Sequence, residues 1–204
     1  MKVSNFYLLR HGKVKGEPAL NGHTDKKVDA QIQASICQAL SCQNIEFDQI
    51  ISSPLRRCSD LLPLLHQQYP SINIELNEQL QELSFGELDG RPFETIKDKW
   101  PLLDAFWKDP ANNPLPKSEL LSDFNQRIVS AWSKQLEAEN KNTLIITHGG
   151  VIRMLLAHAL QVDWKNPAWH SNLSIGNASL THIQVSKTDQ YYINVKSIAR
   201  ALLA

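Results

Sequence analysis

Residues 142–147 (NTLIIT) constrain the fold most, because they form a largely apolar run that is short enough to be one β-strand. Such a run, without alternating polar residues, is typical of a parallel sheet that is covered on both faces. A helical pattern at residues 149–161 follows it directly. Strand patterns at residues 3–9, 47–52 and 72–76 also alternate with helical patterns. This alternation predicts an α/β sandwich with a mostly parallel sheet.

Apolar residues at helical spacing predict the main helices. Residues 29–42 form one helix, capped by its first residue, and residues 118–139 form the longest one. Ser53 and Pro54 are typical of an N-cap followed by proline at the first helical position, so a further helix is expected to begin there. Pro63 should end or kink that helix.

The rest of the chain predicts one domain with a single irregular excursion. Residues 93–116 are rich in tryptophan and proline and show no long period, so short helices and loops are expected there. Strand patterns at residues 180–185 and 191–195 predict a closing hairpin. With 204 residues, of which 42% are hydrophobic, the chain is expected to be a single domain over residues 1–204. The excursion, at about residues 93–120, is expected to cover the active site.

Charge and cysteine usage exclude several classes of protein. The 21 basic residues equal the 21 acidic ones, which disfavours nucleic acid as a partner and a polybasic segment for membrane binding. No apolar run reaches the ~18 residues of a membrane helix, and the first residues are charged too early for a signal peptide. The simplest prediction is a cytoplasmic protein. The three cysteines lack zinc spacing and are expected to be buried free thiols.

Two predicted strands end in the same way, with a histidine followed by glycine. His11 follows the first strand, and His148 follows residues 142–147. In an open parallel sheet, ligands bind beyond the carboxyl ends of the strands. A single histidine there is more often structural, but two in equivalent positions indicate a site.

Charged residues at other strand ends point to a phosphate ligand. Arg56 and Arg57 stand in the first turn of a predicted helix, where basic residues are unfavourable unless an anion binds there. Glu82 follows the third strand beside a glycine turn. A neutral histidine can act as a nucleophile, arginines can bind phosphate oxygens, and a protonated carboxyl group can protonate a leaving alkoxide. The pattern predicts phosphoryl transfer through histidine, with no metal and no cofactor.

Five blocks of sequence, in order, resemble the histidine phosphatase superfamily, in its phosphoglycerate-mutase-like branch. The resemblance implies a three-layer sandwich with helices on both faces of the sheet. The blocks are LLRHGK at 8–13, NGHTD at 21–25, SSPLRRC at 52–58, LQELSFGELDG at 80–90 and THGGVIR at 147–153.

The resemblance also implies a role for each matching residue. His11 corresponds to the nucleophile, His148 to the second catalytic histidine and Glu82 to the proton donor. The phosphate ligands it implies are Arg10, Arg57 (rather than Arg56), Asn21, Gly22 and Gly149. His23 is a candidate for the entrance of the site, and the remaining histidines are expected to be surface or packing residues.

The blocks SSPLRRC and THGGVIR are most similar to the α-ribazole-5′-phosphate phosphatases of cobalamin assembly. Alternatives within the superfamily are a broad-specificity sugar or nucleotide phosphatase and a phosphoglycerate mutase; an alternative of another class is a non-catalytic phospholigand-binding protein. The expected partner is a small phosphate monoester, and a homodimer is left open. Lys13, and Glu119 in a Pro-x-Gly-Glu-Ser-like segment without its glycine, depart from the family pattern, and the roles of the aromatic residues at 100–107 stay open.

Overall fold

A computed structural model describes residues 2–138 and 142–203 of the chain. Six strands form one sheet in the order β3-β2-β4-β1-β5-β6. The first four strands along the chain pair in parallel and the last two form an antiparallel hairpin, which confirms the predicted mostly parallel sheet. The strands are β1 (Lys2–Arg10), β2 (Gln49–Ser52), β3 (Asn73–Leu76), β4 (Asn142–Thr147), β5 (Ser179–Lys187) and β6 (Tyr191–Ala201).

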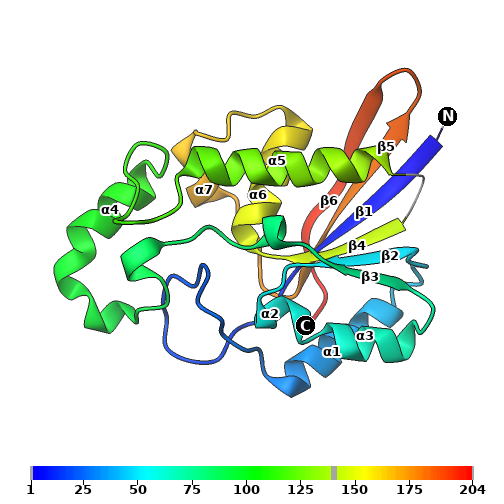
Figure 1. Ribbon diagram of the computed structural model, residues 1–204, viewed down its shortest axis with the longest axis horizontal. Helices are drawn as coiled ribbons and strands as arrows, with labels where there is room; N and C mark the ends of the chain where they lie inside the picture. The colour runs from blue at the N-terminus through cyan, green and yellow to red at the C-terminus, as the bar shows by residue number, and fades with distance from the viewer. Residues whose placement is uncertain (1, 139–141, 204) are drawn as a thin grey trace.

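Helices cover both faces of this sheet (Figure 1). On one face lie α1 (Ala30–Ser41) and α3 (Leu62–Gln68), and on the other lie α5 (Leu121–Glu137) and α6 (Gly149–Leu160). Alternate residues of β4 enter the two cores: Leu144 and Ile146 pack towards α1, and Ile145 packs towards α5. Because both faces are buried, β4 is apolar at consecutive positions.

The helix predicted from Ser53 begins later than expected. Helix α2 (Arg56–Ser59) has Leu55 at its N-cap, so the predicted cap at Ser53 and proline at the first position are wrong. The Ser53 hydroxyl instead contacts His148. The interruption predicted at Pro63 is present, because α2 ends at Ser59 and proline stands in the first turn of α3.

Other helix boundaries follow local capping. Asp29 caps α1 as predicted, accepting a hydrogen bond of 2.8 Å from the Gln31 N–H. Helix α5 begins at Leu121, not at residue 118, and its predicted end at residue 139 lies outside the described residues. A short helix that was not predicted, α7 (Pro167–Asn172), is capped by the side chain of Asn166.

Short helices dominate the segment between β3 and α5. They are η1 (Glu78–Leu80), η2 (Gly86–Leu88), η3 (Phe93–Thr95), η4 (Lys97–Lys99) and α4 (Trp100–Lys108). This segment extends away from the sheet, and α4 lies beyond the carboxyl ends of the parallel strands (Figure 1).

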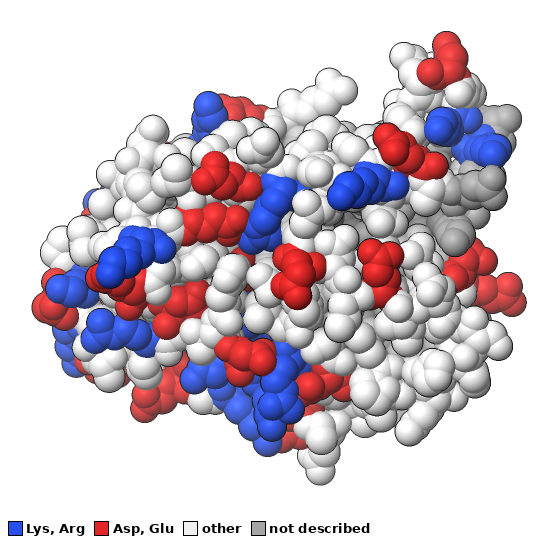
Figure 2. Space-filling model, viewed as in Figure 1, with Lys and Arg blue, Asp and Glu red and all other residues white. Residues whose placement is uncertain are grey.

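The distribution of charge, the helix lengths and the burial of the cysteines agree in part with the predictions from the sequence. On the face drawn in Figure 2, acidic and basic side chains are interspersed. Within the described residues, no helix has the length and apolar character to cross a membrane. All three cysteines are free, but only Cys58 is buried; Cys42 is exposed, so the prediction of buried thiols is wrong for that residue.

The packing of Trp132 yields a test of the larger core. Its ring contacts Phe6 edge-on at 4.6 Å between centroids, and its Nε1 is a buried donor without an acceptor in the described part of the chain. We expect Trp132→Ala to lower the free energy of unfolding by about 3–5 kcal/mol. Trp132→Phe should lower the free energy of unfolding much less, because phenylalanine keeps an aromatic ring and removes the unpaired donor. Urea unfolding measures both, and equal losses would contradict this view of the core.

Candidate active site

The parallel pairing of β1 with β4 places the two histidines side by side. Arg10 stands opposite Thr147 in the register, so the next residues, His11 and His148, leave the sheet together. The His11 N–H donates to the Thr147 carbonyl oxygen at 3.1 Å, which extends the ladder by one bond. The two imidazole rings lie edge to face, with their centroids 5.2 Å apart.

His11 is held as a neutral imidazole with one free nitrogen. Its Nδ1 lies 2.7 Å from the carbonyl oxygen of Gly12. Because a carbonyl only accepts, Nδ1 carries the proton and Nε2 keeps its lone pair. Burial, with Arg57 and Arg10 nearby, lowers the pKa of His11 to about 3. The side chain therefore offers an unprotonated nitrogen at neutral pH.

His148 has the opposite tautomer, because Arg57 fixes its ring. The Arg57 Nε–H donates to His148 Nδ1 at 3.1 Å, so the proton lies on Nε2. That nitrogen is 2.8 Å from the hydroxyl oxygen of Ser53. Complete burial, with Arg57 and His11 adjacent, sets the pKa of His148 well below its usual value. The second histidine is thus a neutral hydrogen-bond donor.

Most N–H donors of Arg57 form hydrogen bonds within the protein. Besides Nε, its guanidinium donates to the carbonyl oxygens of Asn21, Gly22 and Thr24, which leaves one Nη1–H for a ligand. Asn21 lines a cavity at the site, and its buried Oδ1 has no partner among the described residues. The Gly22 N–H donates to Asp89 at 3.1 Å, so Gly22 faces Arg57 through its carbonyl.

Asp89, which was not singled out from the sequence, organises this loop. It accepts from the backbone N–H groups of Gly22, His23, Thr24 and Phe85 and from the Thr24 hydroxyl. Partial burial opposes ionisation, but these hydrogen bonds outweigh it and hold the pKa of Asp89 below its usual value. Any side chain at Gly22 would clash with Asp89 and with the Leu83 carbonyl. A carboxylate thus fixes the loop that holds Arg57.

Arg10 and Arg153 place further positive charge around the start of α6. Arg10 donates to the Ile175 carbonyl, while its buried Nε has no partner in the described chain. Gly149 begins α6, so its N–H has no acceptor within the helix, and a Cβ there would lie 3.4 Å from Arg10 Nε. Arg153, missed in the sequence, donates to the Leu173 carbonyl and lies one turn into α6. Donors placed in this way at a helix N-terminus are chemically able to hold an anion.

The Glu82 carboxyl group also lies beside the start of α6. Its two carboxyl oxygens accept from the N–H groups of Leu83 and Gly150, each at 3.0 Å. Gly150 allows this close approach, because a Cβ there would clash with the carboxyl group. Glu82, Arg10 and His11 line one cavity, and the fully buried His148 lies behind it against His11.

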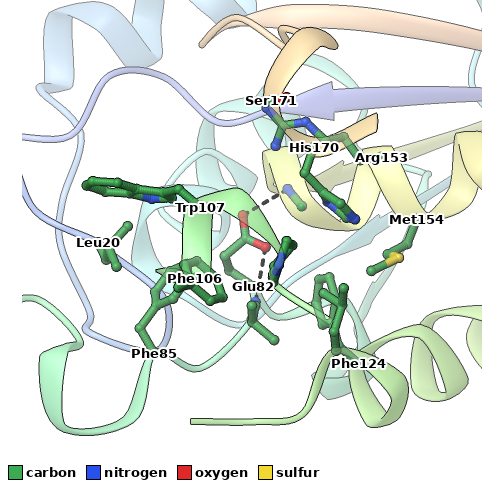
Figure 3. A pocket seen from close by; sticks show the side chains of 14 residues that line it. Leu20, Glu82, Phe85, Phe106, Trp107, Phe124, Arg153, Met154, His170 and Ser171 are labelled. Atoms are coloured by element: carbon green, nitrogen blue, oxygen red, sulfur yellow. Dashed lines mark hydrogen bonds between the residues drawn. The ribbon is translucent and has the colours of Figure 1, made fainter. Parts of the chain in front are cut away.

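Two cavities, of about 380 and 390 Å³, meet at Glu82, Leu20 and Phe85. The second holds the polar end of the site, including Arg10, His11 and the exposed Lys13 at its rim. In the first, an aromatic wall that includes Phe106 and Trp107 faces Arg153, His170 and Ser171 across Glu82 (Figure 3). The arrangement can hold an anion at one end and an apolar group at the other.

The aromatic residues at 100–107 and the other histidines agree only in part with the predictions. Trp107 lines the first cavity, whereas Trp100 packs behind it at 5.6 Å between ring centroids. His170, expected to be a surface or packing residue, lines that cavity, and burial lowers its pKa. His23 is exposed and contacts the Glu82 carbonyl oxygen. Within the described residues, no group of three or more His, Cys, Asp or Glu side chains could hold a metal ion.

Comparisons with known proteins identify the family of the chain. The model of the "Histidine phosphatase superfamily (branch 1)" matches residues 6–196. A "Broad-specificity phosphatase YOR283W" of Saccharomyces cerevisiae is 26% identical over 202 residues, covering 94% of this chain and 84% of the relative.

Solved structures share the fold at low identity. The α-ribazole phosphatase of Shigella flexneri has a TM-score of 0.75 at 17% identity, covering 97% of this chain and 98% of its own. A mycobacterial glucosyl-3-phosphoglycerate phosphatase in complex with inorganic phosphate has a TM-score of 0.81 at 19% identity, covering 98% of both chains.

The fold is that of an α/β protein whose histidines and arginines gather at the carboxyl edge of its sheet. The chain belongs to the histidine phosphatase superfamily, branch 1, and its class is that of the phosphoric monoester hydrolases.

The depressed pKa of His11 predicts acid sensitivity. The unfolded chain takes up this proton below pH 6.5, whereas the folded chain takes it up only near pH 3, so stability falls as the pH falls between these values. Between pH 7 and pH 4, wild type should lose about 3 kcal/mol more unfolding free energy than His11→Asn, in which this titration is absent. Urea unfolding at both pH values measures the difference, and equal losses would exclude a neutral, buried His11.

Proposed function

We propose that the chain hydrolyses a small phosphate monoester through a phosphohistidine on His11. One observation carries the proposal: His11 is neutral, its Nδ1 proton is held by the Gly12 carbonyl, and it lines a cavity beside the unpartnered Nε of Arg10. The nitrogen can attack the phosphorus atom of a phosphoryl group, and the unpaired cationic donor can bind its oxygens.

In the first step, His11 Nε2 attacks phosphorus and the bond from phosphorus to the ester oxygen breaks. Glu82, as a carboxylic acid, gives its proton to the departing oxygen. Arg10, the free Nη1–H of Arg57, the Gly149 N–H and His148 Nε2–H donate to the phosphoryl oxygens as charge develops there. His148 exchanges its Ser53 partner for the phosphoryl group in this step.

In the second step, water attacks the phosphohistidine. Glu82, now a carboxylate, takes a proton from that water, and the bond between nitrogen and phosphorus breaks. Inorganic phosphate and neutral His11 result, with Glu82 again protonated. No metal or cofactor takes part in the proposed steps.

The first cavity supports a leaving group with a flat apolar part. Its aromatic wall is continuous with Glu82, where the ester oxygen would lie, and aromatic faces stack well on a flat heterocycle. α-Ribazole 5′-phosphate, which joins a ribose phosphate to a benzimidazole, is the substrate that we propose. A set of α-ribazole phosphate, phosphoglycerates and sugar phosphates separates this substrate from the broad-specificity and mutase alternatives.

The nucleophile is tested directly. His11→Ala should abolish turnover of p-nitrophenyl phosphate and remove the base-stable phosphoenzyme formed from labelled substrate. His66→Ala, which alters an exposed histidine on α3, should keep both. Wild type should remain active in EDTA. Absence of turnover by wild type between pH 5 and 8 would reject the proposed function.

The substrate is tested at Trp107. Trp107→Ala should raise KM for α-ribazole 5′-phosphate about tenfold, because it removes a stacking surface, and should change KM for glycerol phosphate less than about threefold. Trp100→Ala is a matched control, since Trp100 is as exposed as Trp107 but lies outside the cavity lining. Equal effects of the two substitutions on α-ribazole phosphate would count against this binding mode.

A further inference from the structure

The backbone that carries Glu82 is held by side chains. Four consecutive carbonyl oxygens, from η1 to Glu82, accept side-chain hydrogen bonds, whereas backbone ladders hold the residues at the strand ends. The pairs are Gln79 and Gln81 with Arg127 Nη1 at 2.6 and 2.8 Å, Leu80 with the Thr147 hydroxyl at 2.9 Å, and Glu82 with Arg127 Nη2 and His23 Nε2, both at 3.0 Å.

Arg127, on α5, uses all five of its N–H donors. Three bond the carbonyl oxygens of residues 79, 81 and 82, and two form a bidentate pair with Glu119 at 2.6 and 2.9 Å. The side chains of Arg127 and Glu119 are only 19% and 17% exposed. A bidentate pair with every donor satisfied fixes the guanidinium plane in one orientation.

Glu119 also holds the backbone on the C-terminal side of Glu82. Its backbone N–H donates to the Ser84 carbonyl at 3.1 Å, and its Oε2 accepts from the Ser84 N–H at 3.4 Å. The pair therefore holds the chain on both sides of Glu82. The Glu82 carboxyl group is in turn oriented by Leu83 and Gly150.

We infer that the Arg127–Glu119 pair positions Glu82 for proton transfer, as a device separate from the phosphate-binding arginines. This inference rests on the proposed function, in which Glu82 is the general acid. The pair lies outside both cavity linings and acts through the backbone of residues 79–84. Misplacement of a catalytic group by about 1 Å can lower a rate 10²-fold, so this backbone must be held closely.

A purely structural role would give a different signature. Loss of general stability lowers the activity towards all substrates alike. If the general acid is misplaced, hydrolysis of esters with poor leaving groups, such as glycerol phosphate, becomes much slower. Hydrolysis of p-nitrophenyl phosphate is affected far less, because its leaving group needs little protonation. The ratio of the two kcat values separates the roles.

Arg127→Lys keeps the charge but has three donors in place of five, and Glu119→Gln keeps the shape but weakens the pair. Each should lower kcat for glycerol phosphate about tenfold or more and kcat for p-nitrophenyl phosphate less than about threefold. Ile128→Ala, a core truncation at the neighbouring position of α5, is the control and should leave the ratio unchanged. If Arg127→Lys fails to fold, Glu119→Gln provides the same test.

The double variant with Glu82→Gln tests the coupling. Glu82→Gln alone should slow glycerol phosphate at least about 100-fold, and Arg127→Lys should add almost nothing to that loss. Additive losses, or equal losses on both esters, would overturn the positioning role while leaving the proposed function intact. If Glu82→Gln itself shows no dependence on the leaving group, the assignment of the acid fails, and the positioning role fails with it.

Discussion

The parallel pairing of β1 with β4 is the constraint on which the site depends. Both strands are internal to the sheet, between β2 and β5, and their side chains enter both cores. Such strands cannot slip by one residue without exchanging their buried faces. The register that sets Arg10 opposite Thr147 therefore also fixes the distance between His11 and His148. The geometry of the chemistry that we propose is therefore set by two internal strands that are buried on both faces.

The site concentrates positive charge within a molecule of zero formal net charge. Arg10, Arg57 and Arg153 surround Glu82, and burial with Arg57 and Arg10 nearby keeps the two histidines neutral. Because buried cationic donors are unfavourable without partners, the site is suited to an anion that completes its hydrogen bonds. The zero net charge disfavours a broad basic surface, and the local excess of positive charge favours a small anion in a cavity.

Sequence patterns predicted the elements whose signals are local. The apolar run of β4 has the predicted bounds, and Asp29 caps α1 as expected, because each depends on adjacent residues. The start of α2 was misjudged, since Ser53 bonds a histidine 95 positions away in place of capping the helix. Asp89 was missed because its partners at residues 22–24 lie far away in the sequence. Arg153 and His170 were missed because the cavity that they line is built from distant segments. Arg153 carried one usable signal, because helical spacing places it one turn after the glycines that follow His148.

The segment around Glu119 departs from the family pattern, and Glu119 nevertheless forms a bidentate pair with Arg127. Where the resemblance leads to Pro-x-Gly-Glu-Ser, this chain has Ser118 before Glu119, and the turn is made instead by Lys117 with a φ of 57°. A side chain in this left-handed region costs about 1–2 kcal/mol. Two backbone bonds cross-link the turn to the loop after Glu82, from the Glu87 N–H to Pro116 and from the Glu119 N–H to Ser84. These bonds hold Glu119 where its carboxylate reaches Arg127.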